Sequence, residues 1–302
     1  MTGQAEKLCA LIEAFAGLSA RRLPDDVLER LRVLRAAEDS PAAKRIYDAM
    51  FEDLDLAERL GRPCCQDTGV PQFFVRSGAA FPLLGELEGC LREGIRRATA
   101  SVPLRPNVME CFDERNTGDN TGKRIPWVDW ELLPRRDDAE IYLYLAGGGC
   151  SLPGFARVFM PLEGYGGAVK AVADQIASRG INACPPLLAG IGFGGSVDTA
   201  AKLSKKALLR PVGERNGNPR AAELETRLED ALNGIGIGPG GFGGRGSVLA
   251  VHIEEAGRHT AALAAALSTG CWAHRRSLLR LRADLSYELP FHKGASLKTE
   301  GP

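Results

Sequence analysis

The chain has 302 residues, of which 44% are hydrophobic and 25% are charged, the balance of a folded soluble protein. Lysine plus arginine equals aspartate plus glutamate, at 38 each, so the formal net charge is zero. Phosphate-driven nucleic-acid binding needs clustered basic residues and is therefore disfavoured, whereas a small anionic substrate needs only a few local cations. No apolar run predicts a membrane span, and the opening residues, with Glu6 and Lys7, do not predict a secretory signal. We expect a cytoplasmic protein.

The first 60 residues predict helices. Pro24 precedes an apolar stripe that runs from Val27 to Ala37, so a helix is expected to begin near Pro24. Ser40 and Pro41 are typical N-cap and first-turn residues of the next helix. This region carries few reactive groups, and we expect it to be scaffold.

After Gly61, glycine and proline become frequent and short apolar runs alternate with loops. This texture predicts a mixed α/β domain behind the helical N-terminal region. We expect a single compact domain over residues 1–302, with a helical part over 1–60 and a tail over about 286–302. The expected strands are 72–75, 141–145 and 249–253, and the expected later helices are 167–178, 197–209, 220–232 and 259–267.

Four glycine-rich segments are expected to form loops, because glycine tolerates positive φ and lets the backbone approach a ligand closely. None of them fits the phosphate-loop pattern or a dinucleotide fingerprint. Ordinary flexible loops and ligand contacts both remain open as interpretations. The segments are 147–149, 190–195, 234–246 and the turn at Gly118.

Eight cysteines are expected to be reduced thiols, since a cytoplasmic protein rarely builds a disulfide framework. Each is then a small buried core residue, a metal ligand or a reactive group. Paired C-x-x-C or H-x-x-x-H spacing is absent from the sequence, which disfavours a zinc protein. The eight are Cys9, Cys64, Cys65, Cys90, Cys111, Cys150, Cys184 and Cys271.

Three polar motifs carry chemistry. Residues 64–69 read C-C-Q-D-T-G, which places a thiol, a carboxamide and a carboxylate together, although a polar turn capped by Asp67 or Thr68 would look the same. Arg105 precedes a proline that restrains the local backbone, so its guanidinium is suited to grip a carboxylate, unless it is a surface arginine. The exposed N–H groups of the 147–149 loop could hold another carboxylate.

In chain order, these motifs resemble the α region of the class I fumarase and tartrate dehydratase family. The resemblance runs from about residue 5 to about residue 285. It is carried by C-Q-D-T-G at 65–69, R-P-N at 105–107, N-T-G-D-N at 116–120, G-G-G at 147–149, C-P-P at 184–186, L-L-R-P at 208–211, G-E-R at 213–215, I-G-I-G-P at 235–239, V-H-I-E at 251–254, H-T at 259–260 and Cys271.

The resemblance implies a 4Fe-4S cluster held by Cys65, Cys184 and Cys271. Thiolates are the natural ligands of such clusters, and three ligands leave one iron open to act as a Lewis acid. Cys64 adjoins Cys65, which leaves open which of the two thiols is the first ligand. Two positions depart from the family pattern, since Cys150 stands where serine is common and Ala146 where lysine is common.

The resemblance also implies the roles of five further residues. Gln66, Arg105 and the backbone of Gly148 match groups that hold substrate carboxylates, and Asp67 matches an acid–base residue. His259 matches a histidine beside the substrate, with a packing histidine as the alternative. The implied reaction is the reversible dehydration of a small hydroxy-dicarboxylate, with malate to fumarate and tartrate to oxaloacetate both open.

The family's second domain has no counterpart after about residue 285. We therefore expect a separate β subunit to supply the rest of the active site, in a hetero-oligomer. The alternative is a non-catalytic iron–sulfur or thiol redox module, such as a sensor. That reading leaves Gln66, Asp67, Arg105 and His259 without a purpose, and metal and sulfide analysis would separate the two.

Overall fold

The computed structural model describes residues 2–298, which divide into two compact units. Unit 1 comprises Met1–Asp25, Glu52–Gly147 and Arg275–Pro302, and unit 2 comprises Asp26–Phe51 and Gly148–His274. Each unit has its own β-sheet and its own hydrophobic core. The mixed α/β class is confirmed, and the single domain over 1–302 stays a prediction.

The helical N-terminal region is confirmed as three helices, α1 (Gly3–Arg21), α2 (Asp25–Ala37) and α3 (Pro41–Leu60). The side chain of Ser40 accepts a hydrogen bond from the backbone N–H of Ala43 at 3.4 Å, the contact expected of an N-cap. Pro41 occupies the first position of α3, where its missing N–H costs nothing.

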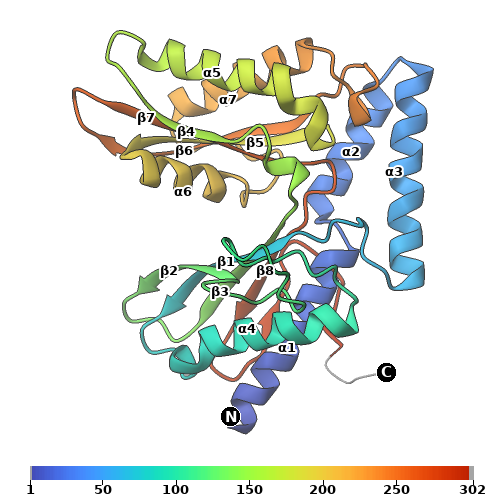
Figure 1. Cartoon of the computed structure of the whole chain (residues 1–302), viewed down its shortest axis with the longest axis vertical. Helices are drawn as coiled ribbons and strands as arrows, with labels where there is room; N and C mark the ends of the chain where they lie inside the picture. The colour runs from blue at the N-terminus through green and yellow to red at the C-terminus, as the bar shows by residue number, and fades with distance from the viewer. Residues whose placement is uncertain (1, 299–302) are drawn as a thin grey trace. The chain divides into compact units, whose positions relative to one another are not determined.

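Unit 1 is built on a five-stranded sheet in the order β2-β1-β3-β8-β9. Strands β1 and β2 are parallel and the other pairs are antiparallel. The sheet, α1 and α4 enclose one hydrophobic core (Figure 1). The elements are β1 (Val70–Gly78), α4 (Leu84–Ser101), β2 (Trp127–Leu133), β3 (Ala139–Ala146), β8 (Arg276–Leu281) and β9 (Tyr287–Glu288).

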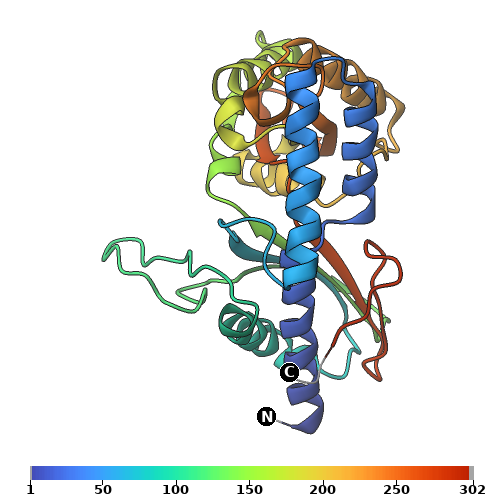
Figure 2. The same ribbon diagram turned by 90° about the vertical axis from the view of Figure 1, so that its right-hand side faces the viewer.

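Residues 102–126 connect α4 to β2 and extend away from the sheet of unit 1 as a long loop (Figure 2). Two isolated bridges, Met109 with Asn116 and Gly122 with Ile125, cross-link this loop. Arg92 on α4 donates to the carbonyls of Gly122 and Ile125 and so ties its end to the helix. The loop contains both the R-P-N and the N-T-G-D-N motifs.

Unit 2 is built on a four-stranded sheet in the order β4-β7-β5-β6. Helices α5 and α7 cover one face of the sheet and α6 covers the other (Figure 1). The elements are η1 (Gly149–Ser151), β4 (Phe155–Phe159), α5 (Gly164–Arg179), η2 (Gly180–Ala183), β5 (Leu187–Gly195), α6 (Val197–Ala207), α7 (Pro219–Gly234), η3 (Pro239–Gly241), β6 (Val248–Arg258) and β7 (Leu263–Gly270).

Two expectations for unit 2 are wrong. The segment 259–267, predicted as a helix, is a turn followed by β7, and the segment 190–195, predicted as a loop, lies in β5. A side chain at Gly192 would place its Cβ 2.0 Å from the carbonyl oxygen of Ala200, so glycine lets α6 pack directly on the sheet. Alanines of β7 pack against α6 in the same way, and this close packing overrides the helix propensity of alanine.

The expected tail over 286–302 contributes structure to unit 1 as far as it is described. Tyr287 and Glu288 form β9 on the edge of β8. His292 is buried, and its Nε2 lies 2.6 Å from the hydroxyl of Ser277. Residues 299–302 lie outside the described residues.

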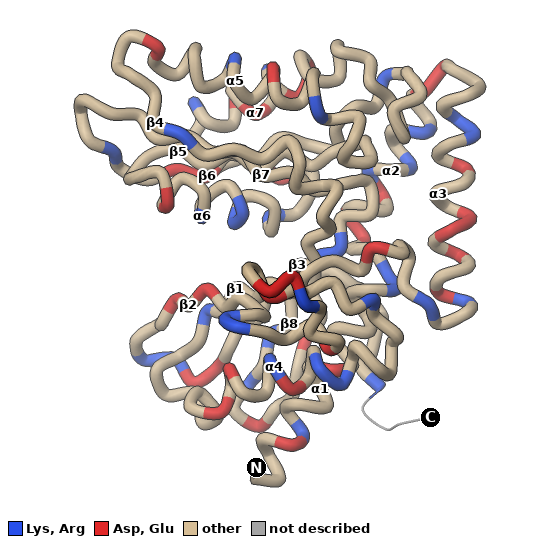
Figure 3. The backbone as a smooth tube through the Cα atoms, viewed as in Figure 1, with Lys and Arg blue, Asp and Glu red and all other residues tan. Residues whose placement is uncertain are grey.

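Charges of both signs are interspersed along the chain (Figure 3), in keeping with the zero net charge. Over the described residues, no helix is both long and apolar enough to cross a membrane.

Candidate functional site

The C-C-Q-D-T-G segment lies between α3 and β1 in unit 1. Gly69 ends it with φ +82°, and an added Cβ there would lie 2.7 Å from the carbonyl carbon of Leu145. Only glycine combines this backbone angle with so close an approach. The turn therefore sets Gly69 directly against the end of β3, and Gln66 and Asp67 precede it in the same turn.

Unit 1 brings Gln66 and Arg105 into direct contact. The Nη1 atom of Arg105 donates to Oε1 of Gln66 at 2.8 Å, and the Arg105 backbone N–H donates to the Thr68 hydroxyl at 3.0 Å. Both Gln66 and Arg105 are exposed, whereas Thr68 is buried. The guanidinium therefore points N–H donors toward solvent from an anchored backbone, an arrangement suited to binding a carboxylate.

Asp67 lies in the same turn and is half-buried. Its Oδ1 accepts hydrogen bonds from the backbone N–H of Gly69 at 3.0 Å and from Nδ2 of Asn107 at 3.1 Å. Three of the predicted site residues, Gln66, Asp67 and Arg105, thus gather within unit 1 over two loops that are far apart in sequence.

The two adjacent thiols of unit 1 have different environments. Cys64 is 3% exposed, and burial raises its pKa to about 11. Its backbone N–H donates to the carbonyl of Ala20 at 3.0 Å, which holds it against the end of α1. Cys65 is half-buried and so reaches solvent. A thiolate ligand must lose its proton, which favours Cys65 over Cys64 as the ligand.

Unit 2 places Cys184 and Cys271 at the same end of its sheet, because β5 begins beside the end of β7, where Leu188 pairs with Gly270. The backbone N–H of Trp272 donates to the carbonyl of Cys184 at 3.0 Å, which joins the two loops. Cys184 is exposed and Cys271 is half-buried.

Gly148 lies at this same end of unit 2. It is exposed and immediately precedes η1. The hydroxyl of Thr269, near the end of β7, donates to the carbonyl of Cys150, and η1 packs beside η2, which leads into Cys184. The glycine loop and the two thiol loops therefore form one neighbourhood within unit 2.

His259 lies at the opposite end of the unit 2 sheet. It follows β6 directly, and Arg258 pairs with Gly195 at the far end of β5 from Cys184. Strand β7 separates it from Cys271, a span of about 25 Å at the usual rise per residue. His259 is exposed, and its Nδ1 accepts a hydrogen bond from the backbone N–H of Ala261 at 3.1 Å.

The accessibility of the thiols fits the implied cluster. Cys65, Cys184 and Cys271 all reach solvent, as does Cys111, whereas the remaining four are buried. Accessible thiols can ionise and bind iron, while buried thiols in apolar surroundings are inert. Within either unit, over residues 2–298, no three His, Cys, Asp or Glu side chains gather so that they could hold a metal ion. Cys65 belongs to unit 1, and Cys184 and Cys271 belong to unit 2.

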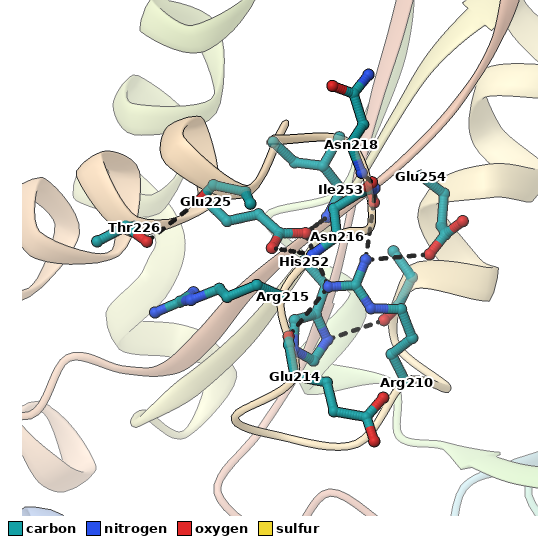
Figure 4. A network of polar contacts seen from close by, with 12 residues as sticks. Arg210, Glu214, Arg215, Asn216, Asn218, Glu225, Thr226, His252, Ile253 and Glu254 are labelled. Carbon is teal, nitrogen blue, oxygen red and sulfur yellow. Dashed lines mark hydrogen bonds and ion pairs between the residues drawn. The ribbon is translucent and has the colours of Figure 1, made fainter. Parts of the chain in front are cut away.

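The structure also explains two motifs to which the sequence assigned no role. Arg210, from L-L-R-P, and Glu254, from V-H-I-E, meet Glu225 of α7 in a polar network at the outer edge of β6 (Figure 4). The Glu225 carboxylate is fully buried and accepts from Arg210 at 2.8 Å and from the N–H of Ile253 at 2.7 Å. Arg210 and Asn216 donate to the Ile253 carbonyl. At this edge of the sheet, side chains therefore pair with the backbone N–H and carbonyl of Ile253, as a further strand would.

Lys205 on α6 is another residue that the sequence analysis did not single out. Burial lowers its pKa, and the neighbouring Cys150 thiol acts in the opposite direction. This cation therefore lies near the loop that carries Gly148. The helical register of α6 gave no signal, because its buried stripe consists of Ala200, Ser204 and Ala207 and does not include Lys205.

Comparison with known proteins shows the family of the chain. The family model described as fumarate hydratase (Fumerase) matches residues 10–280. The α subunits of L(+)-tartrate dehydratase from Escherichia coli strain K12 and from Shigella sonnei are each 52% identical over 291 residues, covering 96% of this chain and 96% of theirs. A protein of Methanocaldococcus jannaschii is 38% identical over 266 residues, covering 87% of this chain and 93% of its own. The chain therefore belongs to the fumarate hydratase (Fumerase) family and is a hydro-lyase.

Proposed function

We propose that the chain is the α subunit of a cytoplasmic iron–sulfur hydro-lyase that dehydrates L(+)-tartrate to oxaloacetate. The observation that carries the substrate is the 52% identity over 96% of the chain to tartrate dehydratase α subunits. Malate and fumarate are the second candidate pair, favoured by the name of the matching family model. Both reactions remove water from a hydroxy-dicarboxylate.

Cys65, Cys184 and Cys271 would hold the 4Fe-4S cluster. Support comes from their accessibility, from the Trp272 contact that joins two of their loops, and from the burial of Cys64. When bound, such a cluster supplies an open iron that acts as a Lewis acid toward the leaving hydroxyl.

The chain's own residues bind the substrate and move protons. Arg105 and Gln66, which contact each other and face solvent, would hold one carboxylate, and the backbone of Gly148 would contribute a further N–H donor. Asp67 would exchange a proton with the substrate oxygen, because it lies in the same turn as Gln66. Dehydration breaks one C–O and one C–H bond and releases one water, and for tartrate the resulting enol tautomerises to the ketone.

His259 remains a proposed histidine beside the substrate, but its position in unit 2 limits which substrate site it can reach. The sheet of unit 2 holds it at the far end of β7 from Cys271. A His259 side chain that contacts a substrate beside Cys271 must therefore belong to a different chain of the assembly from that Cys271. The proton-transfer role in this proposal is accordingly assigned to Asp67.

A separate β subunit would complete the active site in a hetero-oligomer. A dicarboxylate has two anionic ends, and burying one without a cation is costly. The resemblance assigns only one cation of this chain, Arg105, to that task, and the relatives that match it over 96% of their length are named as α subunits.

The test compares the anaerobically purified chain alone with the chain plus its β subunit. We expect the chain alone to bind iron and sulfide but to show little dehydratase activity. Addition of the β subunit should raise turnover of L(+)-tartrate by at least about a hundredfold, since positioning and charge stabilisation each contribute large factors. Oxaloacetate is measured in a coupled assay and fumarate by its absorbance.

Three outcomes would contradict parts of the proposal. A chain that binds no iron after anaerobic reconstitution removes the cluster. Rapid turnover by the chain alone removes the need for a β subunit. Faster turnover of malate than of L(+)-tartrate reverses the substrate assignment.

A further inference from the structure

The long loop of unit 1 between α4 and β2 carries a hairpin, residues 108–117, which we call the arm (Figure 2). Met109 and Asn116 form an antiparallel bridge across it. Beyond that bridge, the backbone N–H of Glu110 donates to the carbonyl of Arg115 at 2.9 Å. The arm therefore holds its shape through its own backbone hydrogen bonds, and a partner that binds it has little conformational freedom left to remove.

The base of the arm is fixed to α4 by a buried asparagine. Asn120 is 1% exposed, and its Nδ2 donates to the Thr99 hydroxyl on α4 at 3.2 Å and to the Arg105 carbonyl at 3.0 Å. Its Oδ1 accepts from the Asn107 N–H at 2.8 Å. These contacts to the helix restrain the direction in which the arm leaves unit 1, and they hold the backbone of Arg105 as well.

The tip of the arm exposes apolar side chains. Phe112 is 100% exposed and Met109 is 52% exposed. Among the large hydrophobic side chains of residues 2–298, only Leu162 is as exposed as Phe112. One exposed apolar residue is ordinary on a protein surface. An aromatic ring held out on a restrained hairpin, however, has the residue type and the presentation of an anchor that fills a pocket on a partner.

The arm is also acidic. It carries three acidic side chains, Glu110, Asp113 and Glu114, and one basic side chain, Arg115. Within residues 2–298, none of these four side chains forms an ion pair. The arm therefore presents a net negative charge, which would attract a partner with a basic surface.

The arm begins close to residues that the proposed function assigns to the substrate. Arg105, which contacts Gln66, precedes Phe112 by seven residues, a stretch of chain that spans at most about 25 Å. A protein–protein interface of ordinary size covers about 800 Å² per partner, which is a patch roughly 30 Å across. A subunit that completes the site at Arg105 can therefore reach the tip of the arm within the same interface.

We propose that the arm is a docking element for the β subunit, and that Phe112 fills an apolar pocket with a basic rim on that subunit. The inference rests on the proposed function, which requires a β subunit beside Arg105. That subunit brings the cation for the second carboxylate of the substrate, so its surface toward the site is positively charged and complements the acidic arm. A second copy of this chain has the same acidic arm and a net charge of zero, which makes it the weaker electrostatic match.

The test measures binding of the purified β subunit to the full-length, cluster-loaded chain by anaerobic biolayer interferometry. Phe112→Ala should weaken binding by at least about thirtyfold, mainly through faster dissociation. Iron content and Tm should match the wild type, because the Phe112 side chain is fully exposed. Leu162→Ala is the matched control and should bind within about twofold of the wild type. Leu162 is equally exposed and follows β4, whose last residue, Phe159, pairs with Leu263 at the end of the unit 2 sheet away from Cys271.

The acidic side chains are tested through the association rate. The double variant Asp113→Asn, Glu114→Gln removes two negative charges and leaves Phe112 in place. It should lower the association rate by about fivefold at low salt and flatten the decrease of that rate with ionic strength, since charges at an interface act mainly on diffusional encounter. An association rate and salt dependence equal to those of the wild type would overturn the basic rim.

A photo-cross-link identifies the partner directly. With Phe112 replaced by p-benzoylphenylalanine, ultraviolet irradiation of the complex should join this chain to the β subunit. A cross-link between two copies of this chain would make the second copy the occupant and overturn the assignment.

Wild-type affinity in Phe112→Ala would overturn the inference, and so would an equal loss of affinity in Leu162→Ala. Failure of the proposed function gives a different result. A complex that depends on Phe112 but dehydrates neither tartrate nor malate would refute the proposed function and keep the arm as its docking element. Turnover of L(+)-tartrate by a complex that forms equally well with Phe112→Ala would keep the function and refute the arm.

Discussion

The buried network at the edge of β6 yields a quantitative prediction for Glu225→Ala. The Glu225 side chain is fully buried and accepts from Arg210, from the Asn216 N–H at 2.9 Å and from the Ile253 N–H. Removing one partner of a buried ion pair typically costs about 3–5 kcal/mol, because the other charge is left without compensation. Arg210 keeps Glu254 and the Ile253 carbonyl, which places the expected loss near the lower value, about 3 kcal/mol.

The loss can be measured by thermal and urea unfolding of the purified chain, followed by circular dichroism. For a unit of this size, about 3 kcal/mol corresponds to a fall in Tm of roughly 6–12 °C. Glu223→Ala is the matched control on the same helix, since Glu223 is 70% exposed and lies 3.8 Å from Arg227. It should change stability by less than about 0.5 kcal/mol. A Glu225→Ala loss below about 1 kcal/mol would refute the argument from burial.

Three further predictions concern the site and the C-terminal segment. Cys65→Ser should abolish iron binding and Cys64→Ser should retain it, because of these two adjacent thiols only Cys65 reaches solvent; iron and sulfide analysis decides between them. Arg105→Lys should raise KM by about tenfold or more with iron content unchanged, since an ammonium lacks the planar fork of guanidinium; steady-state kinetics would show this. Burial lowers the pKa of His292 to about 4, below the 6.5 of the unfolded chain. The free energy of unfolding should therefore fall by roughly 3 kcal/mol as pH falls from about 6.5 to 4, because the unfolded chain binds the proton in that range and the folded chain does not. His292→Asn should flatten that pH dependence in unfolding experiments.

A specific result would contradict each of these three predictions. If Cys64→Ser loses iron and Cys65→Ser keeps it, then Cys64 and not Cys65 is the first ligand. A wild-type KM in Arg105→Lys would mean that Arg105 does not contact the substrate, and Arg115→Lys in the same loop is the control for charge and length. An equal pH dependence in wild type and His292→Asn would assign the acid instability to other groups.

Local sequence determined the elements whose signals are local. Ser40 and Pro41 define the start of α3 through an N-cap contact within three residues. The apolar stripe after Pro24 produced α2 at its expected place. The chemistry of the C-C-Q-D-T-G turn was also readable, because the unusual residue types lie side by side. Helix α4 was missed although buried positions such as Leu87, Leu91 and Ile95 follow helical spacing.

Tertiary structure alone decided the features that depend on distant partners. Residues 263–270 form a strand because β4 and β5 offer pairing on both sides, and Gly192 belongs to β5 because α6 lies against it. The different burial of Cys64 and Cys65 depends on where α1 ends. The contact of Asn107 with Asp67 joins residues 40 positions apart, and no local pattern encodes it. Sequence periodicity reports one segment's own preference, whereas pairing, burial and hydrogen-bond partners are properties of two segments brought together by the fold.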